Sequence, residues 1–171
     1  KGSYQKENCN TATTAILRLQ KKGWKISNKH IKKGLLNSIK NTTLLGRWQI
    51  LGKDPLIICD TGHNEDGIKQ VLYQIKQTPH KKLHIVFGVA DDKDLERILP
   101  ILPKNAIYYF CKANVSRGMN AKTLKNAASK FKLSGNTFNN VKNAFQEAKK
   151  QAANKDLIFI GGSTFIVAEV I

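Results

Sequence analysis

Cysteine is scarce in this sequence, and its three copies form no recognised metal-binding or redox spacing. Cys9, Cys59 and Cys111 are widely separated along the chain. Cys59 and Cys111 lie in apolar runs, where buried free thiols are common. We therefore expect a reduced, cytoplasmic protein with no metal site in this chain.

Long apolar segments are also missing, as is any secretory signal. No run of residues is long and apolar enough to cross a bilayer, and the polar N-terminus has no apolar h-region. The sequence does not begin with Met, and we expect it to be a fragment. Its 171 residues suffice for one well-packed core and an appendage. We expect no contact with a membrane.

Acidic residues are few. The 12 Asp and Glu residues are outnumbered by 29 Lys and Arg residues, which gives a formal net charge of +17 at pH 7. Such a charge permits nucleic-acid binding, or an enzyme that acts on polyanions such as nucleotides and polycarboxylates. The lysines are scattered, however, and no zinc-finger or RNP-type motif is present. A compositional bias towards Lys and Asn on solvated faces explains the charge equally well, so the charge leaves the function open.

Glycine-rich phosphate-binding motifs are missing too. Gly52-Lys53-Asp54 lacks the glycines and the preceding strand of a Walker phosphate loop, and no G-x-G-x-x-G motif follows the first predicted strand. Gly162-Ser163-Thr164 lacks the G-x-S-x-G pattern of a nucleophilic serine, so we expect no hydrolase triad of Ser163, His63 and Asp60. A basic edge with one histidine and one serine suits the binding of anionic groups better than nucleophilic attack.

What is present is an alternation of short apolar runs and segments of helical periodicity after residue 46. The pattern predicts strands at 47–51, 56–60, 82–88, 106–111, around 137–138 and at 157–160, and helices at 67–76, 95–102, 121–131, 141–153 and 164–171. Val- and Ile-rich strands with little polar alternation are typical of a parallel sheet covered on both faces. The first two strands are close enough to pair antiparallel. The sequence therefore predicts an α/β fold with a Rossmann-like, mostly parallel sheet, helices on both faces and an antiparallel edge strand.

Residues 1–45 are predicted to form a two-helix appendage and a linker. Apolar periodicity favours a helix at 8–22, which Gly23 can end, and a second helix with apolar residues between 31 and 39. Residues 41–46 are the predicted linker. Because two short amphipathic helices cannot bury their apolar faces alone, we expect them to belong to a larger missing domain or to pack as an appendage.

Polar or glycine turns follow several of the predicted strands. The carboxyl ends of parallel strands meet at one edge of a sheet, and that edge is where ligands bind in open α/β folds. The turn 60–67 after the second strand is the richest in polar residues. We expect one edge to present a site-like set of side chains: Asp60, His63, Asn64, Lys93, Arg117 and Ser163.

Four segments of this edge, in this order and spacing, are similar to those of a known family: Gly46-Arg47-Trp48-Gln49, Asp60-Thr61-Gly62-His63-Asn64, Phe87-Gly88-Val89-Ala90-Asp91-Asp92-Lys93-Asp94 and Gly161-Gly162-Ser163-Thr164-Phe165. Residues 46–171 resemble the carboxyl-terminal, glutamate ligase domain of folylpolyglutamate synthase/dihydrofolate synthase, the folate branch of the Mur ligase superfamily. Residues 1–45 resemble the carboxyl-terminal helices of that family's central ATPase domain plus a linker. Glu65 departs from the family, which usually has proline at this position.

The resemblance implies an ATP-dependent ligase, in which ATP phosphorylates a folate or dihydropteroate carboxylate and the amine of L-glutamate attacks the acyl phosphate. It implies that Arg47 contacts the phosphates of ATP, Asp60 the ribose hydroxyls and Asn8 the adenine. It also implies catalytic positions near the glutamate or the acyl phosphate for three residues: His63, Lys93 and Ser163. The phosphate loop, the Mg²⁺ ligands and most of the pterin site lie in the family's amino-terminal part. The resemblance thus implies a fragment that is inactive without its missing ATPase domain, and we expect a monomer.

Several of these roles have a structural alternative. Asp60 and Ser163 could cap helices, His63 could be a surface histidine, and Arg47 and Lys93 could be surface ion partners. A cell-wall Mur ligase that extends a UDP-linked precursor and a basic nucleic-acid-binding module are the alternative functions. The sequence leaves open which acceptor is extended and what Arg117 does.

Overall fold

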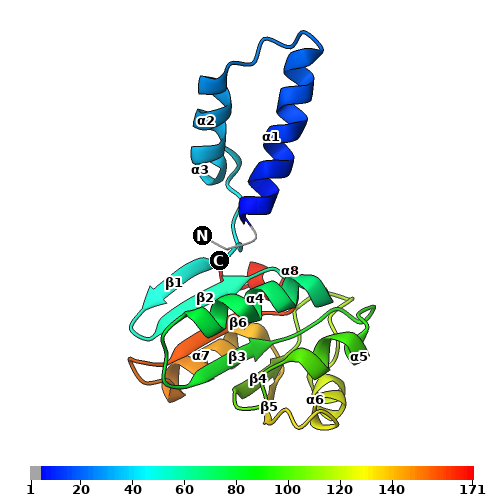
Figure 1. Cartoon of the computed structure of the whole chain (residues 1–171). Coiled ribbons are helices and arrows are strands. Elements are labelled where there is room, and N and C mark those ends of the chain that lie inside the picture. Colours follow the sequence, from blue (N-terminus) through cyan, green and yellow to red (C-terminus); the bar gives the residue numbers. More distant parts are fainter. Residues whose placement is uncertain (1–4) are drawn as a thin grey trace. The chain divides into compact units, whose positions relative to one another are not determined.

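The computed structural model describes residues 5–171. The chain divides between Leu45 and Gly46 into two compact units, a helical unit and a sheet unit (Figure 1).

The helical unit consists of three short helices: α1 (Gln5–Lys21), α2 (Asn28–Leu36) and α3 (Ser38–Thr42). Ser27 caps α2, where its hydroxyl accepts a hydrogen bond from the backbone N–H of His30. The second predicted helix is interrupted at Asn37, whose side chain donates back to the Lys33 carbonyl. These three helices bury none of their residues. None of the helices within residues 5–171 is long and apolar enough to cross a membrane.

The sheet unit is built on one six-stranded sheet. In spatial order its strands are β1 (Gln49–Lys53), β2 (Leu56–Asp60), β6 (Leu157–Gly161), β3 (Leu83–Phe87), β4 (Ile107–Cys111) and β5 (Gly135–Phe138). β1 and β2 pair antiparallel, and every other neighbouring pair is parallel. The predicted fold class is therefore confirmed, including the antiparallel edge strand.

Helices cover both faces of this sheet (Figure 1). One face packs against α4 (Glu65–Gln77), α5 (Leu95–Ile98) and α6 (Ala121–Ser129), and the other against α7 (Val141–Gln151) and α8 (Thr164–Ala168). Neighbouring strand residues belong to opposite layers of the core, as Ile58 and Ile57 do. Every residue of β3 and β6 is buried, which explains why these strands are apolar runs without polar alternation.

Several predicted boundaries differ from the structure, among them those of β1, α5 and α8. β1 begins at Gln49 because residues 46–48 form a tight turn. The helix predicted at 95–102 changes after Ile98 into the 3₁₀ helix η1 (Leu99–Ile101), where Pro100 cannot donate a helical hydrogen bond. The final helix ends at Ala168 and not at the last residue.

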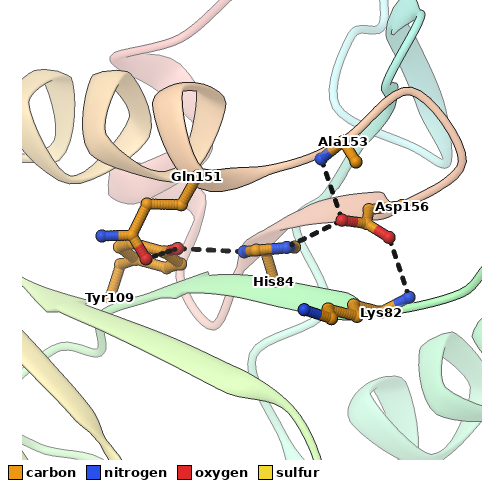
Figure 2. A network of polar contacts seen from close by, with 6 residues as sticks. All are labelled: Lys82, His84, Tyr109, Gln151, Ala153 and Asp156. Carbon is orange, nitrogen blue, oxygen red and sulfur yellow. Dashed lines mark hydrogen bonds and ion pairs between the residues drawn. The ribbon is translucent and has the colours of Figure 1, made fainter.

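A buried polar network lies at the amino-terminal edge of the sheet (Figure 2). The ring of His84, 1% exposed, places Nδ1 2.9 Å from the Tyr109 hydroxyl and Nε2 3.4 Å from Asp156 Oδ2. Asp156, 4% exposed, also accepts hydrogen bonds from the backbone N–H groups of Lys82 (3.0 Å) and Ala153 (2.9 Å). The network fastens the α7–β6 connection to β3 and β4.

The surroundings of two members of the network set their ionisation. The Ala153 amide, and after it the Lys82 amide and His84, hold the pKa of Asp156 below its usual value. Burial raises the pKa of Tyr109 to about 12, so its hydroxyl keeps its proton at neutral pH. Asp156 is therefore a carboxylate within the buried network.

Candidate functional site

Three strands end side by side at the carboxyl edge of the sheet. The register pairs Asp60 of β2 with Gly161 of β6, and Gly161 with Phe87 of β3. The loops that follow these strands therefore leave the sheet from neighbouring positions. They carry three of the predicted site residues: His63, Lys93 and Ser163.

Asp60 is buried, with 1% of its surface exposed. Its Oδ2 accepts a hydrogen bond from the Trp48 amide at 2.7 Å, and its Oδ1 accepts one from the Gly62 amide at 2.8 Å. The cap of α4 is Asn64, whose side chain accepts from the Gly67 amide, so the helix-capping alternative for Asp60 does not apply. Asp60 instead organises two loops, the turn before β1 and the start of the β2–α4 loop.

Arg47 lies in the turn that Asp60 holds. Gly46 and Trp48 both have positive φ, 73° and 46°, and glycine adopts this conformation without strain. A Cβ atom on Gly46 would lie 2.8 Å from Thr61 Cγ2, and the Gly46 carbonyl accepts from the Thr61 amide at 2.9 Å. The turn packs closely against the end of β2 and leaves the Arg47 side chain exposed.

His63 and Lys93 line one cavity of about 250 Å³ between the β2–α4 and β3–α5 loops. His63 Nδ1 lies 3.0 Å from the Thr61 carbonyl oxygen. Because a carbonyl oxygen only accepts hydrogen bonds, Nδ1 carries the hydrogen, and Nε2 is the acceptor of the neutral ring. The fold thus brings together two of the residues predicted to be catalytic.

The same cavity carries further charges of both signs, on Glu65, Asp66, Asp94 and Arg97. Arg97 Nε lies 3.2 Å from Asp94 Oδ2. A hydrogen bond from Lys69 holds the pKa of Glu65 below its usual value. A ligand with both an ammonium group and carboxylates would therefore meet partners of both signs. Arg97 is not among the predicted site residues, although its place four residues after Lys93, within a predicted helix, is an available signal.

The loop that carries Lys93 is fastened to the loop after β4. Arg117 Nη2 donates to Asp92 Oδ2 at 2.7 Å, and the Arg117 carbonyl accepts from the Asp91 amide at 2.9 Å. An isolated antiparallel bridge joins the same two loops. The Arg117 and Asp92 side chains are 63% and 53% exposed, so their ion pair adds little to stability. The contacts of Arg117 hold the Lys93 loop in place, a role that the sequence left open.

Ser163 is buried, 4% exposed, and caps α8. Its Oγ accepts a hydrogen bond from the Phe165 amide at 3.2 Å. Gly162, directly before it, has a φ of 94°, and a Cβ atom there would lie 2.5 Å from the Phe87 ring. Ser163 thus makes the capping contact, and its contact with a substrate stays a prediction.

Asn8 lies on α1 in the helical unit, where its side chain is exposed. It is therefore not among the side chains that the sheet unit gathers at its carboxyl edge. Its predicted contact with adenine stays a prediction.

The described residues contain neither a ready metal site nor an activated thiol at this edge. Within residues 5–171 no three His, Cys, Asp or Glu side chains are grouped so that they could hold a metal ion. Burial, and after it the charge of Asp60, raises the pKa of Cys59 to about 11, which keeps this thiol protonated at neutral pH.

Residues 46–164 match the Mur ligase family in its glutamate ligase domain, and the chain belongs to this family. The match covers the sheet, three of the four edge segments in full and the fourth as far as Thr164, and the resemblance is confirmed.

Two curated relatives carry more specific names than the family. The chain is 29% identical to a probable bifunctional folylpolyglutamate synthase/dihydropteroate synthase of Haloferax volcanii, over 98% of this chain and 19% of the relative. It is 32% identical to a dihydrofolate synthase/folylpolyglutamate synthase of Buchnera aphidicola, over 80% of this chain and 33% of the relative. The chain therefore spans a third or less of the length of these relatives.

A solved structure agrees with these two relatives. A bifunctional folylpolyglutamate synthase/dihydrofolate synthase with Mn, AMPPNP and L-glutamate bound matches this chain with a TM-score of 0.76 and 27% sequence identity. The match covers 93% of this chain and 37% of the solved one. The chain is thus similar to a folate ligase over nearly all of its own length.

Proposed function

We propose that residues 46–171 are the carboxyl-terminal domain of an ATP-dependent ligase that joins L-glutamate to a folate or dihydropteroate carboxylate through an acyl phosphate. The family membership and the folate ligases to which the chain is similar support this assignment. The cell-wall branch of the family is the alternative enzyme.

The observation that carries the proposal is the cavity between His63 and Lys93. Its lining combines cationic groups with carboxylates, and its volume of about 250 Å³ suits a small zwitterion. An amino acid such as glutamate offers one ammonium group and two carboxylates to these partners. Neighbouring strand ends supply the loops that form it, so the lining is held by the sheet and not by a flexible arm.

Each side chain then has a defined task. The Lys93 ammonium, a compact charge, holds a carboxylate of the incoming glutamate. His63 Nε2 accepts a hydrogen bond from the amine of this glutamate and so directs the nitrogen lone pair at the acyl carbon. The nitrogen attacks, the C–N bond forms and the C–O bond to phosphate breaks, so that phosphate leaves. The proton that the nitrogen loses passes to His63 Nε2. The contribution of this domain is mainly positioning and electrostatics.

The nucleotide contacts are proposed at the adjacent turn. Arg47 is exposed there and available to a phosphate, while Asp60 holds the turn through the Trp48 amide. We assign Ser163 to the acyl phosphate region and Asn8 to adenine. We assign Asp60 to the ribose hydroxyls, a contact that requires its carboxylate, 1% exposed in this structure, to become accessible when ATP binds. Mg²⁺ would neutralise the phosphates of ATP. The described residues offer no group of ligands for this ion, so we assign its ligands to the missing part and derive no step from it.

The missing part is the proposed partner of this chain. We assign residues 1–45 to the end of the central ATPase domain, whose remaining segments would cover apolar side chains such as Trp24 and Leu36, 63% and 65% exposed. The whole enzyme is proposed to be a cytoplasmic monomer that uses ATP, L-glutamate and a folate or dihydropteroate acceptor. The 171-residue chain alone should release no phosphate from ATP in the presence of acceptor and glutamate.

The proposal is tested by steady-state kinetics of the full-length ligase. Lys93→Ala should raise the KM for glutamate by about tenfold or more, because a charge-assisted contact is lost. His63→Ala should lower kcat more than it changes the KM for ATP. Arg47→Ala should raise the KM for ATP. Lys122→Ala removes an exposed lysine of α6 and should change none of these constants.

The alternatives give different results in the same set of assays. A cell-wall ligase would extend a UDP-linked precursor and ignore both folate acceptors. A nucleic-acid-binding module would bind DNA with an affinity that falls steeply as salt is raised. Either outcome, or unchanged kinetics of both Lys93→Ala and His63→Ala, would overturn the proposal.

A further inference from the structure

A second cavity lies at the opposite, amino-terminal edge of the sheet unit. Its volume is about 350 Å³, within the range of about 300–1,000 Å³ that is typical of small-molecule sites. Its floor is apolar and comes from α4, β3 and the segment after α5: Leu72, Ile75, Leu83, Ile101 and Pro103. Ile75 and Leu83 are buried, so this floor is part of the core.

The rim of the cavity is cationic. Three lysines, Lys76, Lys81 and Lys82, line it together with His80, and none of the described residues that line the cavity is Asp or Glu. An apolar floor under a positive rim complements a ligand with an apolar body and one anionic group. A cation or a neutral polar molecule would lose one of these two interactions.

The backbone that presents these cations is held at several points. His80 Nδ1 lies 2.6 Å from the Thr78 carbonyl oxygen, and the Lys81 amide donates to the Lys155 carbonyl at 2.9 Å. The Lys82 amide donates to Asp156 Oδ1 in the buried network (Figure 2). Lys82 contributes its backbone amide to that network, and its side chain is exposed. The segment 78–82 is therefore ordered before any ligand binds.

We propose that this cavity binds a free amphipathic carboxylate, with its aliphatic or aromatic body on the apolar floor and its carboxylate among the three lysines. The site is at the other end of the strands from the edge proposed for ligation. It does not depend on the proposed function.

Decanoate, a soluble carboxylate with an apolar chain, is the probe. We expect saturable one-site binding to the 171-residue chain, with the largest amide shifts in ¹⁵N NMR spectra at Leu83, Ile101 and the segment 78–82. Acetate lacks the apolar body and decanol lacks the charge, so both should bind at least about tenfold more weakly. Higher salt should weaken decanoate binding.

Charge variants separate a specific site from general attraction to a basic protein. Replacing Lys76, Lys81 and Lys82 together by Gln should raise the Kd for decanoate by about tenfold, since exposed ion pairs are individually weak. The control replaces Lys122, Lys130 and Lys142 by Gln, which removes the same charge from other exposed positions. That control should leave the Kd unchanged.

Three outcomes would overturn the proposal. These are the absence of saturable binding, equal weakening in the two triple variants, and decanol binding as tightly as decanoate. Binding to anionic lipid vesicles but not to free decanoate would assign the lysines to a membrane surface instead. Circular dichroism on both triple variants checks that the fold is retained.

Discussion

The two ends of the parallel strands hold their polar groups in different ways. At the amino-terminal edge His84 and Asp156 are themselves buried, and their side chains bond one another and the backbone. At the carboxyl edge His63 is exposed and Lys93 half-buried, and the order comes from the backbone beneath them.

The difference follows from what each edge has to do. Side chains that meet a ligand must stay accessible, so they cannot be fixed by burial and need a rigid support. At the carboxyl edge that support consists of Gly46 and Gly162, which have positive φ, the buried Asp60, and the ion pair between Arg117 and Asp92. We therefore expect stability at this edge to depend on the glycine backbone and on Asp60, and at the other edge on the buried contact between His84 and Asp156.

The largest effect is expected at Gly162. An Ala there would have a φ of 94° and a Cβ atom 2.5 Å from the Phe87 ring and 2.7 Å from the Gly88 carbonyl oxygen. Strain and overlap together should lower the free energy of unfolding by about 3 kcal/mol. Urea denaturation followed by circular dichroism measures it. Ile50→Ala, at a position 56% exposed, is the control and should change stability by no more than about 0.5 kcal/mol. An unchanged Gly162→Ala variant would contradict the close approach of the two strand ends.

A loss of about 2–3 kcal/mol is expected for Asp156→Ala, because His84 and two backbone amides lose a buried partner. Asp94→Ala is the matched change at the carboxyl edge. Asp94 also accepts from a backbone amide, that of Glu96, but it is exposed, and its loss should cost about 1 kcal/mol. Equal losses in the two variants, measured by urea denaturation, would remove the contrast between the edges.

Part of the Asp156 effect should depend on pH. Its pKa is lower in the folded chain than in the unfolded chain, so its charge stabilises the fold above the pKa of an unfolded aspartate. That contribution is lost as the pH falls through the lower, folded value. Asp156→Asn should therefore lose less stability than the unchanged chain between about pH 5 and pH 2. Urea titrations across this range test it, and parallel curves would contradict it.

The smallest effect is expected for Arg117→Ala. Its exposed ion pair with Asp92 should contribute no more than about 0.5 kcal/mol to stability, which a double-mutant cycle with Asp92→Ala can measure. The amide of Asp91 should nevertheless exchange its hydrogen faster, because the two loops lose the Arg117–Asp92 contact that joins them. Arg117→Lys keeps the charge and should restore part of the protection. Unchanged exchange in Arg117→Ala would show that the backbone alone holds the Lys93 loop.

Much of the fold could be predicted from the sequence, because it is encoded locally. The predicted strand at 56–60 is β2 as observed, and the polar turn and helix after it are present. The apolar runs predicted a parallel sheet because β3 and β6 are buried on both faces, which the pattern of their residues records. The predicted start of β1 was wrong because the turn at 46–48 depends on a contact with Asp60, a residue distant in sequence.

The sequence by itself determined the α/β class, the antiparallel edge and the family, since these follow from periodicity and from four short segments. Only the tertiary structure decided that Asp60 is buried and holds the turn before β1, and that Ser163 caps α8. It also decided that Arg117 pairs with Asp92 and holds the Lys93 loop. It also revealed the buried contact between His84 and Asp156, 72 residues apart. The physical reason is that local patterns record which face of an element is buried. A hydrogen bond or an ion pair between distant residues depends on how the elements pack, and no local pattern records it.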